Sequence, residues 1–247
     1  MKTFYLTDAG KVRSHNEDSV IITKNQNGDY LMAVADGMGG HSAGEVASSI
    51  VISHISKCFN DQFIDMSKSA AVDWIRKMAT EVNDLIFEYA NVHAESKGMG
   101  TTLVCAIVTK DYILIGNIGD SSGFVVKNNV LHKVTYDHTL VNLLVKAGEL
   151  TPEEAKDHPK KNVLMKALGA NNPIDIDIFD CDMDISGILL CSDGLTTMLD
   201  EVQIEKVILE EELEIEDKVI KLIRKSNNRG GNDNISIAYM EFVESGD

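Results

Sequence analysis

The sequence predicts an α+β fold in which helices cover antiparallel sheets. Two observations lead to this prediction. Apolar segments of strand length come in groups joined by tight turns, which is the pattern of antiparallel hairpins. Amphipathic helical segments cluster between these groups. The 247 residues suffice for one large core. Because no linker-like or repeated segment interrupts the chain, we expect a single domain over residues 1–247.

The composition narrows the possible partners and compartments. A net charge of −16, from 39 acidic against 23 basic residues, disfavours nucleic acid and anionic membrane surfaces as partners. No apolar run approaches the roughly 18 residues of a membrane span, and the N-terminus lacks an apolar signal segment. The four cysteines form no C-x-x-C pair, which fits reduced thiols. We therefore expect a cytoplasmic protein.

Two strands and two helices are expected in the first hundred residues. Residues 19–23 and 30–35 are apolar runs of strand length. Residues 42–58 and 67–96 carry apolar residues at spacings of three and four, as amphipathic helices do. His54 lies on the apolar stripe of the first helix. We interpret it as a hydrogen-bonded histidine in the core or at its boundary rather than as a ligand.

The rest of the chain alternates between strand and helix patterns. Strands are expected at residues 102–109, 112–118, 123–127, 130–135, 187–190 and 235–242. Asp111 and the pair Asn128-Asn129 mark tight turns between neighbouring strands. Two further helices are expected at residues 200–209 and 215–225.

The segment 137–160 departs from this pattern. It contains two short helical stretches, 140–147 and 151–157. Thr151 and Pro152 make a good helix start, because a threonine cap followed by proline suits the first turn. Such an insertion between strands is either a lid or recognition segment or an ordinary helical excursion.

A run of glycines follows an acidic residue at the end of the strand 30–35. Asp36 stands at the strand end, and Gly37 begins a tight turn before the next helix. The carboxylate of Asp36 and the carbonyl of Gly37 are hard oxygen ligands, and glycine permits close approach because it has no Cβ atom. The alternative for this stretch by itself is a glycine-rich turn that ends a strand.

Five other acidic residues occupy similar places. Each lies at one end of an apolar run, beside glycine or asparagine: Glu17, Asp18, Asp120, Asp193 and Asp233. Packed sheets can bring strand ends together, so we expect these side chains to converge. An oxygen-only set without a His/Cys cluster indicates Mg²⁺ or Mn²⁺ rather than zinc.

Six short motifs connect these acids into one ordered pattern. They are R-x-x-N-E-D at 13–18, D-G-M-G-G-H-x-A-G-E at 36–45, M-G-T-T at 99–102, G-D-S at 119–121, S-D-G-L at 192–195 and G-G-x-D-N at 230–234. Each motif alone is a weak signal. The ordered set, which extends from about residue 7 to residue 241, resembles the bacterial branch of the type 2C metal-dependent protein phosphatases, the PPM family.

The resemblance implies a fold, a cofactor and a set of ligands. The implied fold is a four-layer α-β-β-α sandwich, two antiparallel sheets flanked by helices, with residues 137–160 as a flap beside the active site. The implied cofactor is Mn²⁺ or Mg²⁺, as two bridged ions plus a weaker third. In this pattern Asp36 bridges the two ions and the Gly37 carbonyl binds one of them. The other metal ligands implied are Asp193, Asp233 and, for the third ion, Asp120 with Asp193.

The resemblance also implies roles for residues around the ions. Glu17 and Asp18 act through bound water or from outside the ligand shell, with Asp18 counted among the catalytic residues. Arg13 is a phosphate clamp, because a guanidinium matches two phosphate oxygens. Taken by itself, Arg13 is more readily interpreted as one partner of a surface ion pair with Glu17, and the spacing to the acidic pair and the family pattern reverse that interpretation. His41 is a candidate general acid or a helix cap, and a metal-bound water is the alternative acid.

Two positions depart from the family pattern. Met38 stands where eukaryotic relatives have a histidine, and methionine cannot donate a proton. Ser122 stands where the family commonly has arginine after G-D-S, which removes a cation near Asp120. We expect the second change to alter local structure or substrate contacts without abolishing the chemistry.

The resulting hypothesis is a Mn²⁺/Mg²⁺-dependent phosphatase of phosphoserine and phosphothreonine in proteins. A metal-activated water is the nucleophile, and the implied partners are phosphoproteins and a cognate Ser/Thr kinase. The alternatives are a catalytically silent binding or scaffold module of the same fold and a phosphatase of small phosphometabolites. A silent module should have lost one of Asp36, Asp193 or Asp233, and all three are present.

Overall fold

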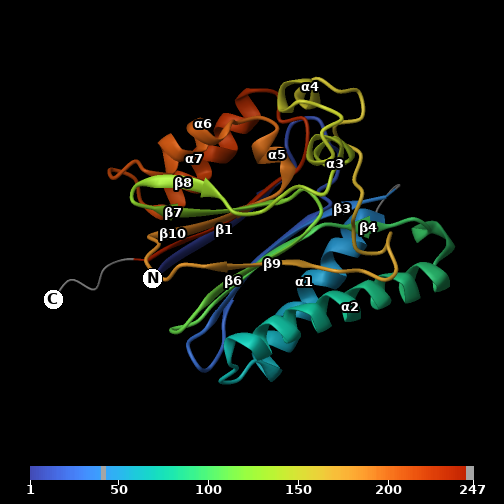
Figure 1. The fold of residues 1–247 in the computed structure, drawn as a ribbon, viewed down its shortest axis with the longest axis horizontal. Helices are drawn as coiled ribbons and strands as arrows, with labels where there is room; N and C mark the ends of the chain where they lie inside the picture. Colours follow the sequence, from blue (N-terminus) through green and yellow to red (C-terminus); the bar gives the residue numbers. More distant parts are fainter. Residues whose placement is uncertain (40–42, 243–247) are drawn as a thin grey trace.

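Two antiparallel sheets stack face to face in the computed structural model, which describes residues 1–39 and 43–242 (Figure 1). The first sheet has the strand order β1 (Lys2–Asp8), β11 (Ile235–Glu241), β10 (Gly187–Cys191), β7 (Ser122–Lys127) and β8 (Val130–Lys133). The second has the order β2 (Asp18–Lys24), β3 (Tyr30–Met38), β5 (Leu103–Val108), β6 (Ile113–Ile118) and β9 (Asp177–Cys181), and β4 (Gly100–Thr101) pairs with β3.

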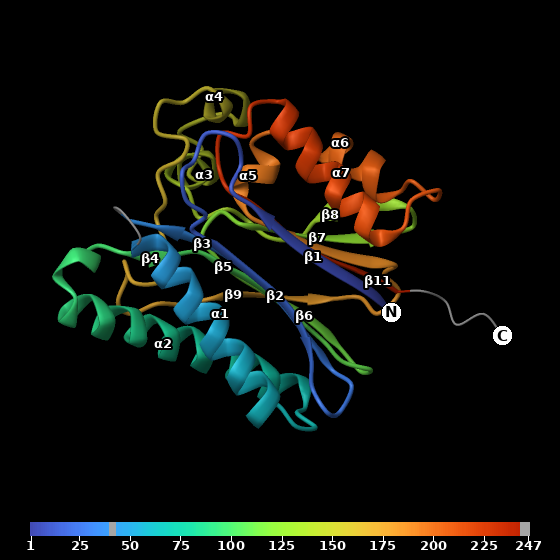
Figure 2. The ribbon, with the colours of Figure 1, turned by 180° about the vertical axis from the view of Figure 1, so that it is seen from behind.

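Helices cover the outer face of each sheet. The helices α1 (Ala43–Gln62) and α2 (Lys68–Val92) lie on the second sheet, and the short 3₁₀ helix η1 (Ala94–Ser96) follows them (Figures 1 and 2). On the first sheet lie α5 (Asp193–Thr196), α6 (Glu201–Ile208) and α7 (Ile215–Asn228). This arrangement confirms the predicted α-β-β-α sandwich. Within the described ranges, no helix combines the length and the apolar character needed to cross a membrane.

The strands separate three apolar layers because their side chains alternate between the two faces of a sheet. In β3, Leu31, Ala33 and Ala35 pack toward α1 and α2, while Met32 and Val34 pack between the sheets. A third core lies between the first sheet and its helices. Central strands are therefore buried on both faces, which explains why they are continuous apolar runs in the sequence.

Most predicted elements are confirmed, and the strands β1, β4 and β9 were missed. The Asn128-Asn129 turn is the tight hairpin expected, with positive φ angles of 52° and 57°. The strand β1 escaped prediction because its pairing partner, β11, lies at the other end of the chain and no local turn marks it. The strand β9 escaped prediction because it has only five residues, DIFDC, and two of them are acidic.

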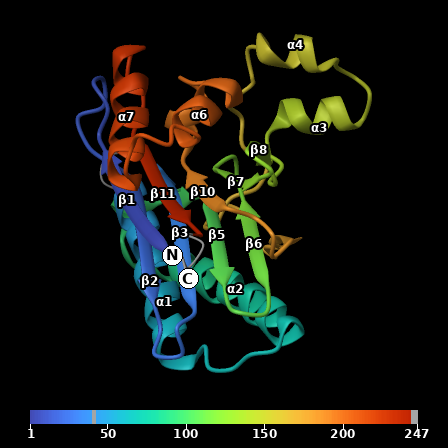
Figure 3. The same ribbon diagram turned by 90° about the vertical axis from the view of Figure 1, so that its left-hand side faces the viewer.

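The segment 137–160 forms a projection at one end of the sandwich. Its helices are α3 (Leu140–Lys146) and α4 (Pro152–Lys156), and both stand out from the layers (Figure 3). Thr139 caps α3, and Thr151 forms a reciprocal capping box with Glu154 in α4. The predicted helix start at Thr151 is therefore confirmed.

Candidate active site

The pairing of β2 with β3 places two acidic residues side by side. Asp18 and Asp36 are opposite one another in the antiparallel register. The amide of Gly37 donates to the carbonyl of Glu17 at 3.1 Å, which extends the pairing by one more contact. The strand ends therefore bring the R-x-x-N-E-D and D-G-M-G-G motifs together.

Asn234 connects the G-G-x-D-N motif to the R-x-x-N-E-D motif. Its Oδ1 accepts a hydrogen bond from the amide of Glu17 at 2.8 Å, and its Nδ2 donates to the carbonyl of His15 at 2.9 Å. The amide of Asn234 in turn donates to Asp233 Oδ1 at 2.9 Å. These bonds hold Asp233 beside the end of β2, although the two segments are more than two hundred residues apart in the chain.

Ser192 makes the corresponding link for the S-D-G-L motif. Its Oγ donates to Asp18 Oδ2 at 2.7 Å and accepts from the amide of Ser236 at 2.9 Å. Ser192 is fully buried, so both bonds are shielded from water. Asp193, the next residue, begins α5 at this point. Residues of both sheets thus converge on Asp18.

Two threonines of the M-G-T-T motif hold the backbone of Asp36. The hydroxyl of Thr101 donates to the carbonyl of Asp36 at 2.9 Å, and the Oγ1 of Thr102 accepts from its amide at 3.0 Å. Thr102 Oγ1 also lies 2.7 Å from Ser121 Oγ in the G-D-S motif. The sequence analysis assigned these threonines no role, because hydroxyl-to-backbone contacts over 65 residues leave no local pattern.

Asp120 is positioned by a residue that the sequence analysis did not identify. The amide of Gly119 donates to His138 Nδ1 at 3.0 Å, and the amide of His138 donates to the carbonyl of Gly119 at 2.9 Å. His138 Nε2 lies 3.1 Å from Asp177 Oδ2, which orients the ring. His138 therefore fixes the turn that carries Asp120. The only sequence signal was its place directly after a strand, at the base of the predicted flap.

The acidic residues of this cluster repel one another. Burial, followed by the charges of Asp18 and Asp193, raises the pKa of Asp36 well above its ordinary value. Burial likewise raises the pKa of Asp18 to about 7, of Asp120 to about 7 and of Asp193 to about 6. Such crowding of carboxyl groups is costly unless protons or cations compensate the charge.

Several buried oxygens of the cluster lack a hydrogen-bond partner. Among the residues that the structure describes, Glu17 Oε1, Asp18 Oδ1 and Asp193 Oδ1 accept no hydrogen bond. Buried polar atoms are rarely left without a partner, and orphaned carboxylate oxygens facing other carboxylates suit hard divalent cations. The donor set therefore fits the Mn²⁺ or Mg²⁺ predicted from the sequence.

Gly37 is required at its position by close backbone packing. A Cβ atom there would overlap the carbonyl of Gly44 in α1 and the carbonyl of Glu17. The expectation that Gly37 permits close approach to a cation stays a prediction, and the group that packs against Gly37 in the structure is the protein backbone. This packing places the first turn of α1 directly against the end of β3.

Arg13 contacts the cluster at its exposed edge. Its Nη2 lies 2.7 Å from Asp233 Oδ2, and half of its side chain is accessible to solvent. The alternative considered from the sequence was a surface ion pair of Arg13 with Glu17. In the structure, Arg13 pairs with Asp233 instead. Arg13 is therefore available to a ligand that approaches the carboxylates from solvent.

The remaining predicted positions have different outcomes. His41 lies outside the described residues, so its two candidate roles stay predictions. Met38 is half-buried at the end of β3. Ser122 is buried in β7 opposite Cys191, and its hydroxyl has no partner among the described residues. Ser122 therefore belongs to the packed sheet, and the expected effect of the missing arginine stays a prediction.

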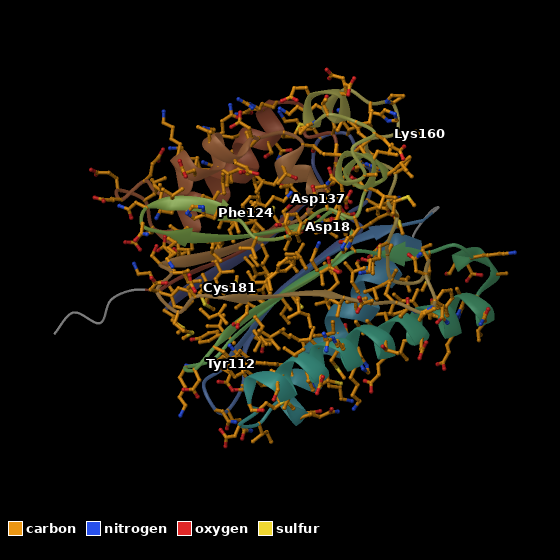
Figure 4. All side chains as sticks on the ribbon, viewed as in Figure 1. Asp18, Tyr112, Phe124, Asp137, Lys160 and Cys181 are labelled. Atoms are coloured by element: carbon orange, nitrogen blue, oxygen red, sulfur yellow. The ribbon has the colours of Figure 1, made fainter. Side chains whose placement is uncertain are left out.

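A groove of about 860 Å³ joins the cluster to the projecting segment 137–160. Asp120 and Asp193 line one end, and Val141 and Ala155 of the projecting helices line another part. Lys133 and Lys161 add positive charge to the same lining. In Figure 4, Asp18 and Asp137 lie at the same end of the sandwich, with Lys160 further out on the projection. The segment 137–160 therefore borders the candidate site.

The sequence of this chain matches a known protein family and several of its members. Residues 9–234 match the family model for protein phosphatase 2C. The serine/threonine phosphatase stp of Listeria welshimeri is 39% identical over 242 residues, which cover 98% of this chain and 96% of that protein. The protein phosphatase PhpP of Streptococcus pneumoniae is 35% identical, covering 99% of this chain and 98% of that protein.

Solved structures agree with these relatives. The serine/threonine phosphatase of S. agalactiae superposes with a TM-score of 0.92 at 36% identity, covering 98% of this chain and 99% of that one. The Mycobacterium tuberculosis serine/threonine phosphatase PstP/Ppp superposes with a TM-score of 0.86 at 31% identity, covering 98% and 99%. The fold is therefore shared with both of these solved structures.

Proposed function

The chain belongs to the protein phosphatase 2C family, and from that premise we propose how its residues divide the reaction among them. The protein is a metal-dependent protein-serine/threonine phosphatase that acts on phosphoproteins. The observation that carries the assignment of residues is the convergence of acids from both sheets, with buried oxygens that have no partner among the described residues.

The proposed metal ligands follow from this convergence. Asp36, the Gly37 carbonyl, Asp193 and Asp233 would hold two of the ions, and Asp120 with Asp193 would hold a third. When bound, such ions would supply a nucleophilic water at neutral pH and would neutralise phosphate charge. Glu17 and Asp18 orient the surrounding water, and Ser192 keeps Asp18 in place.

Three kinds of phosphopeptide test the function directly. Phosphate release from phosphothreonine and phosphoserine peptides is expected with Mn²⁺ or Mg²⁺ and is lost in EDTA. Release from a phosphotyrosine peptide is expected to be much slower. Faster turnover of small phosphometabolites than of any phosphopeptide would contradict the assignment. We further propose a cytoplasmic role opposite a Ser/Thr kinase, which the free thiols of all four cysteines support.

Arg13→Ala is expected to raise KM for a phosphothreonine peptide by about tenfold with kcat changed only a few-fold. Arg13 lies at the exposed edge of the cluster, and a clamp that binds phosphate equally in the ground and transition states mainly affects KM. Arg13→Lys is the matched variant, since it keeps the charge but loses the fork. Steady-state kinetics separates the two constants. An unchanged KM with a collapsed kcat would assign Arg13 another role.

Asp120→Ala is expected to lower kcat on a phosphopeptide by at least about tenfold, because general acid catalysis typically contributes about 10²–10⁴-fold. The rate on an activated aryl phosphate, whose leaving group needs little protonation, should fall less. Calorimetric counting should still find two ions per chain. Wild-type phosphopeptide turnover would show that Asp120 serves only as a turn residue.

The flap, residues 137–160, is proposed to contact protein substrates. It borders the groove beside Asp120 and Asp193, and it supplies none of the proposed metal ligands. Exchanging residues 140–157 for the segment of a relative is expected to change rates on phosphoproteins severalfold while leaving a small aryl phosphate nearly unaffected. Equal losses on both substrate types would count against this role.

A further inference from the structure

A second group of side chains with metal-binding chemistry lies in the helix layer over the second sheet. His54 and Cys58 belong to α1, and Glu81 belongs to α2. One ligand atom from each residue lies within 4.8 Å of both others. His54 Nε2 is 3.1 Å from Glu81 Oε2 and 3.5 Å from Cys58 Sγ. The three groups therefore point at one another across the interface of the two helices.

The two helices hold these groups in a defined arrangement. His54 and Cys58 are four residues apart, so they lie on the same face of α1. Figures 1 and 2 show α1 and α2 side by side on the sheet. Trp74 of α2 packs edge-on against Phe59 of α1, with ring centroids 6.2 Å apart. Because Phe59 follows Cys58 directly, this aromatic contact fixes the turn that carries the thiol.

Two of the three ligand-atom distances are close to those of a tetrahedral site. Zinc bonds of about 2.0 Å to nitrogen and 2.3 Å to sulfur place neighbouring ligand atoms about 3.3–3.6 Å apart. The nitrogen-to-sulfur distance of 3.5 Å falls within this interval, and the nitrogen-to-oxygen distance of 3.1 Å needs only a small adjustment. The expected hydrogen bonding of His54 is thus confirmed, whereas a role as a ligand departs from the interpretation made from the sequence.

The chemistry of the three ligands differs from that of the carboxylate cluster. Imidazole and thiolate favour zinc-like ions, whereas Mg²⁺ and Mn²⁺ favour oxygen. Burial and the charge of Glu81 raise the pKa of Cys58, so the metal-free side chain is a thiol. On binding an ion, the thiol releases its proton to water. The resulting thiolate and the Glu81 carboxylate balance the two charges of the ion.

Solvent can reach this group from outside the helix layer. The side chains of His54 and Glu81 are 29% and 37% exposed, while Cys58 is buried. An ion can therefore enter from solvent, and a water molecule can complete a fourth position. Lys77 lies 3.4 Å from the other Glu81 oxygen, Oε1. The contact of His54 with Oε2 is therefore separate from the ion pair between Lys77 and Glu81.

We propose that His54, Cys58 and Glu81 bind a divalent transition-metal ion such as Zn²⁺, and that the ion links α1 to α2. The site is distinct from the catalytic centre in position as well as in chemistry. Gly44, which packs against Gly37, is ten residues before His54, or about 15 Å along the helix axis. The bound ion thus stabilises the helix whose first turn supports the catalytic loop.

Cobalt substitution in the metal-free full-length protein tests this site. Co²⁺ bound to a thiolate gives a sulfur-to-metal charge-transfer band in the near ultraviolet, which an oxygen-only site cannot give. We expect this band to saturate at one Co²⁺ per chain and to disappear when Zn²⁺ is added. Cys58→Ser should abolish it. Cys181→Ser, the matched control at a half-buried cysteine in β9, should retain it.

Two further variants test the site without replacing Cys58, so the result does not depend on the folding of the serine variant alone. His54→Gln and Glu81→Gln each keep Cys58 and should weaken Co²⁺ binding at least tenfold. Mn²⁺-dependent turnover of Cys58→Ser should match that of the wild type, which verifies its fold, because none of the three residues is assigned to the catalytic cluster. No thiolate band in the wild type, or a band that survives Cys58→Ser, would overturn the proposal.

Discussion

Asp36→Asn is expected to lower kcat on a phosphothreonine peptide by about 10³-fold or more, since metal ions supply several kcal/mol of catalysis and each 1.36 kcal/mol is tenfold in rate. Asp36 lies at the centre of the cluster, opposite Asp18 in the strand register. The charges of Asp18, Asp193, Asp120 and Asp233 all disfavour ionisation of Asp36. The asparagine keeps the shape of the side chain but removes the charge that holds the cations.

The same substitution is expected to stabilise the metal-free protein. In EDTA, removing one charge from a set of repelling carboxylates should raise the free energy of unfolding, measured in urea. Asp84→Asn is the matched control, because Asp84 is exposed on α2 and outside the cluster. Near-wild-type turnover, or a destabilised metal-free variant, would show that Asp36 does not have this central place. Loss of function together with a gain in stability identifies a residue held under electrostatic strain.

The stability of the metal-free protein is expected to fall as pH rises from 5 to 7. The pKa values of Asp18 and Asp120, about 7, and of Asp193, about 6, lie above the ordinary value of 3.8. The folded state therefore binds more protons than the unfolded state in this interval, and stability falls with rising pH. The expected loss is several kcal/mol, because each of the three protons contributes up to about 1.36 kcal/mol per pH unit.

Urea unfolding across this pH interval, with EDTA or with saturating Mn²⁺, measures the effect. Mn²⁺ needs deprotonated ligands, so its stabilising effect should grow as pH rises. Asp18→Asn should reduce the slope in EDTA, whereas contributions from histidines elsewhere remain. A metal-free protein that becomes more stable between pH 5 and pH 7 would contradict the proposed charge crowding.

Several features of the site could be predicted from residues alone. The acids at strand ends, the glycine after Asp36 and the hairpin turn at Asn128-Asn129 each have a local cause, namely the limits that sterics place on short stretches of backbone. The same holds for the helix start at Thr151, which hydrogen bonding of the first helical turn explains. The resemblance of the ordered motifs then supplied the layer order, which periodicity cannot reveal.

Other features depend on contacts between distant segments. The strand β1 exists because β11 pairs with it, and the roles of Thr101, Thr102 and His138 arise from hydrogen bonds that span up to 66 residues. The pairing of Arg13 with Asp233 joins residues 220 positions apart. None of these leaves a local signal, because the partner of each group is set by the folded chain and not by its neighbours in sequence.

The sequence by itself determined the class of fold, the family and the identity of the acids, because each is written in short-range spacing or in ordered motifs. Only the tertiary structure decided which carboxylate oxygens lack partners and which side chains position the acidic residues. It also decided that His54, Cys58 and Glu81 meet across two helices. The physical reason is that hydrogen bonds and charge repulsion act over a few ångströms of space. Distances of that kind between remote residues exist only once the sheets and helices have packed.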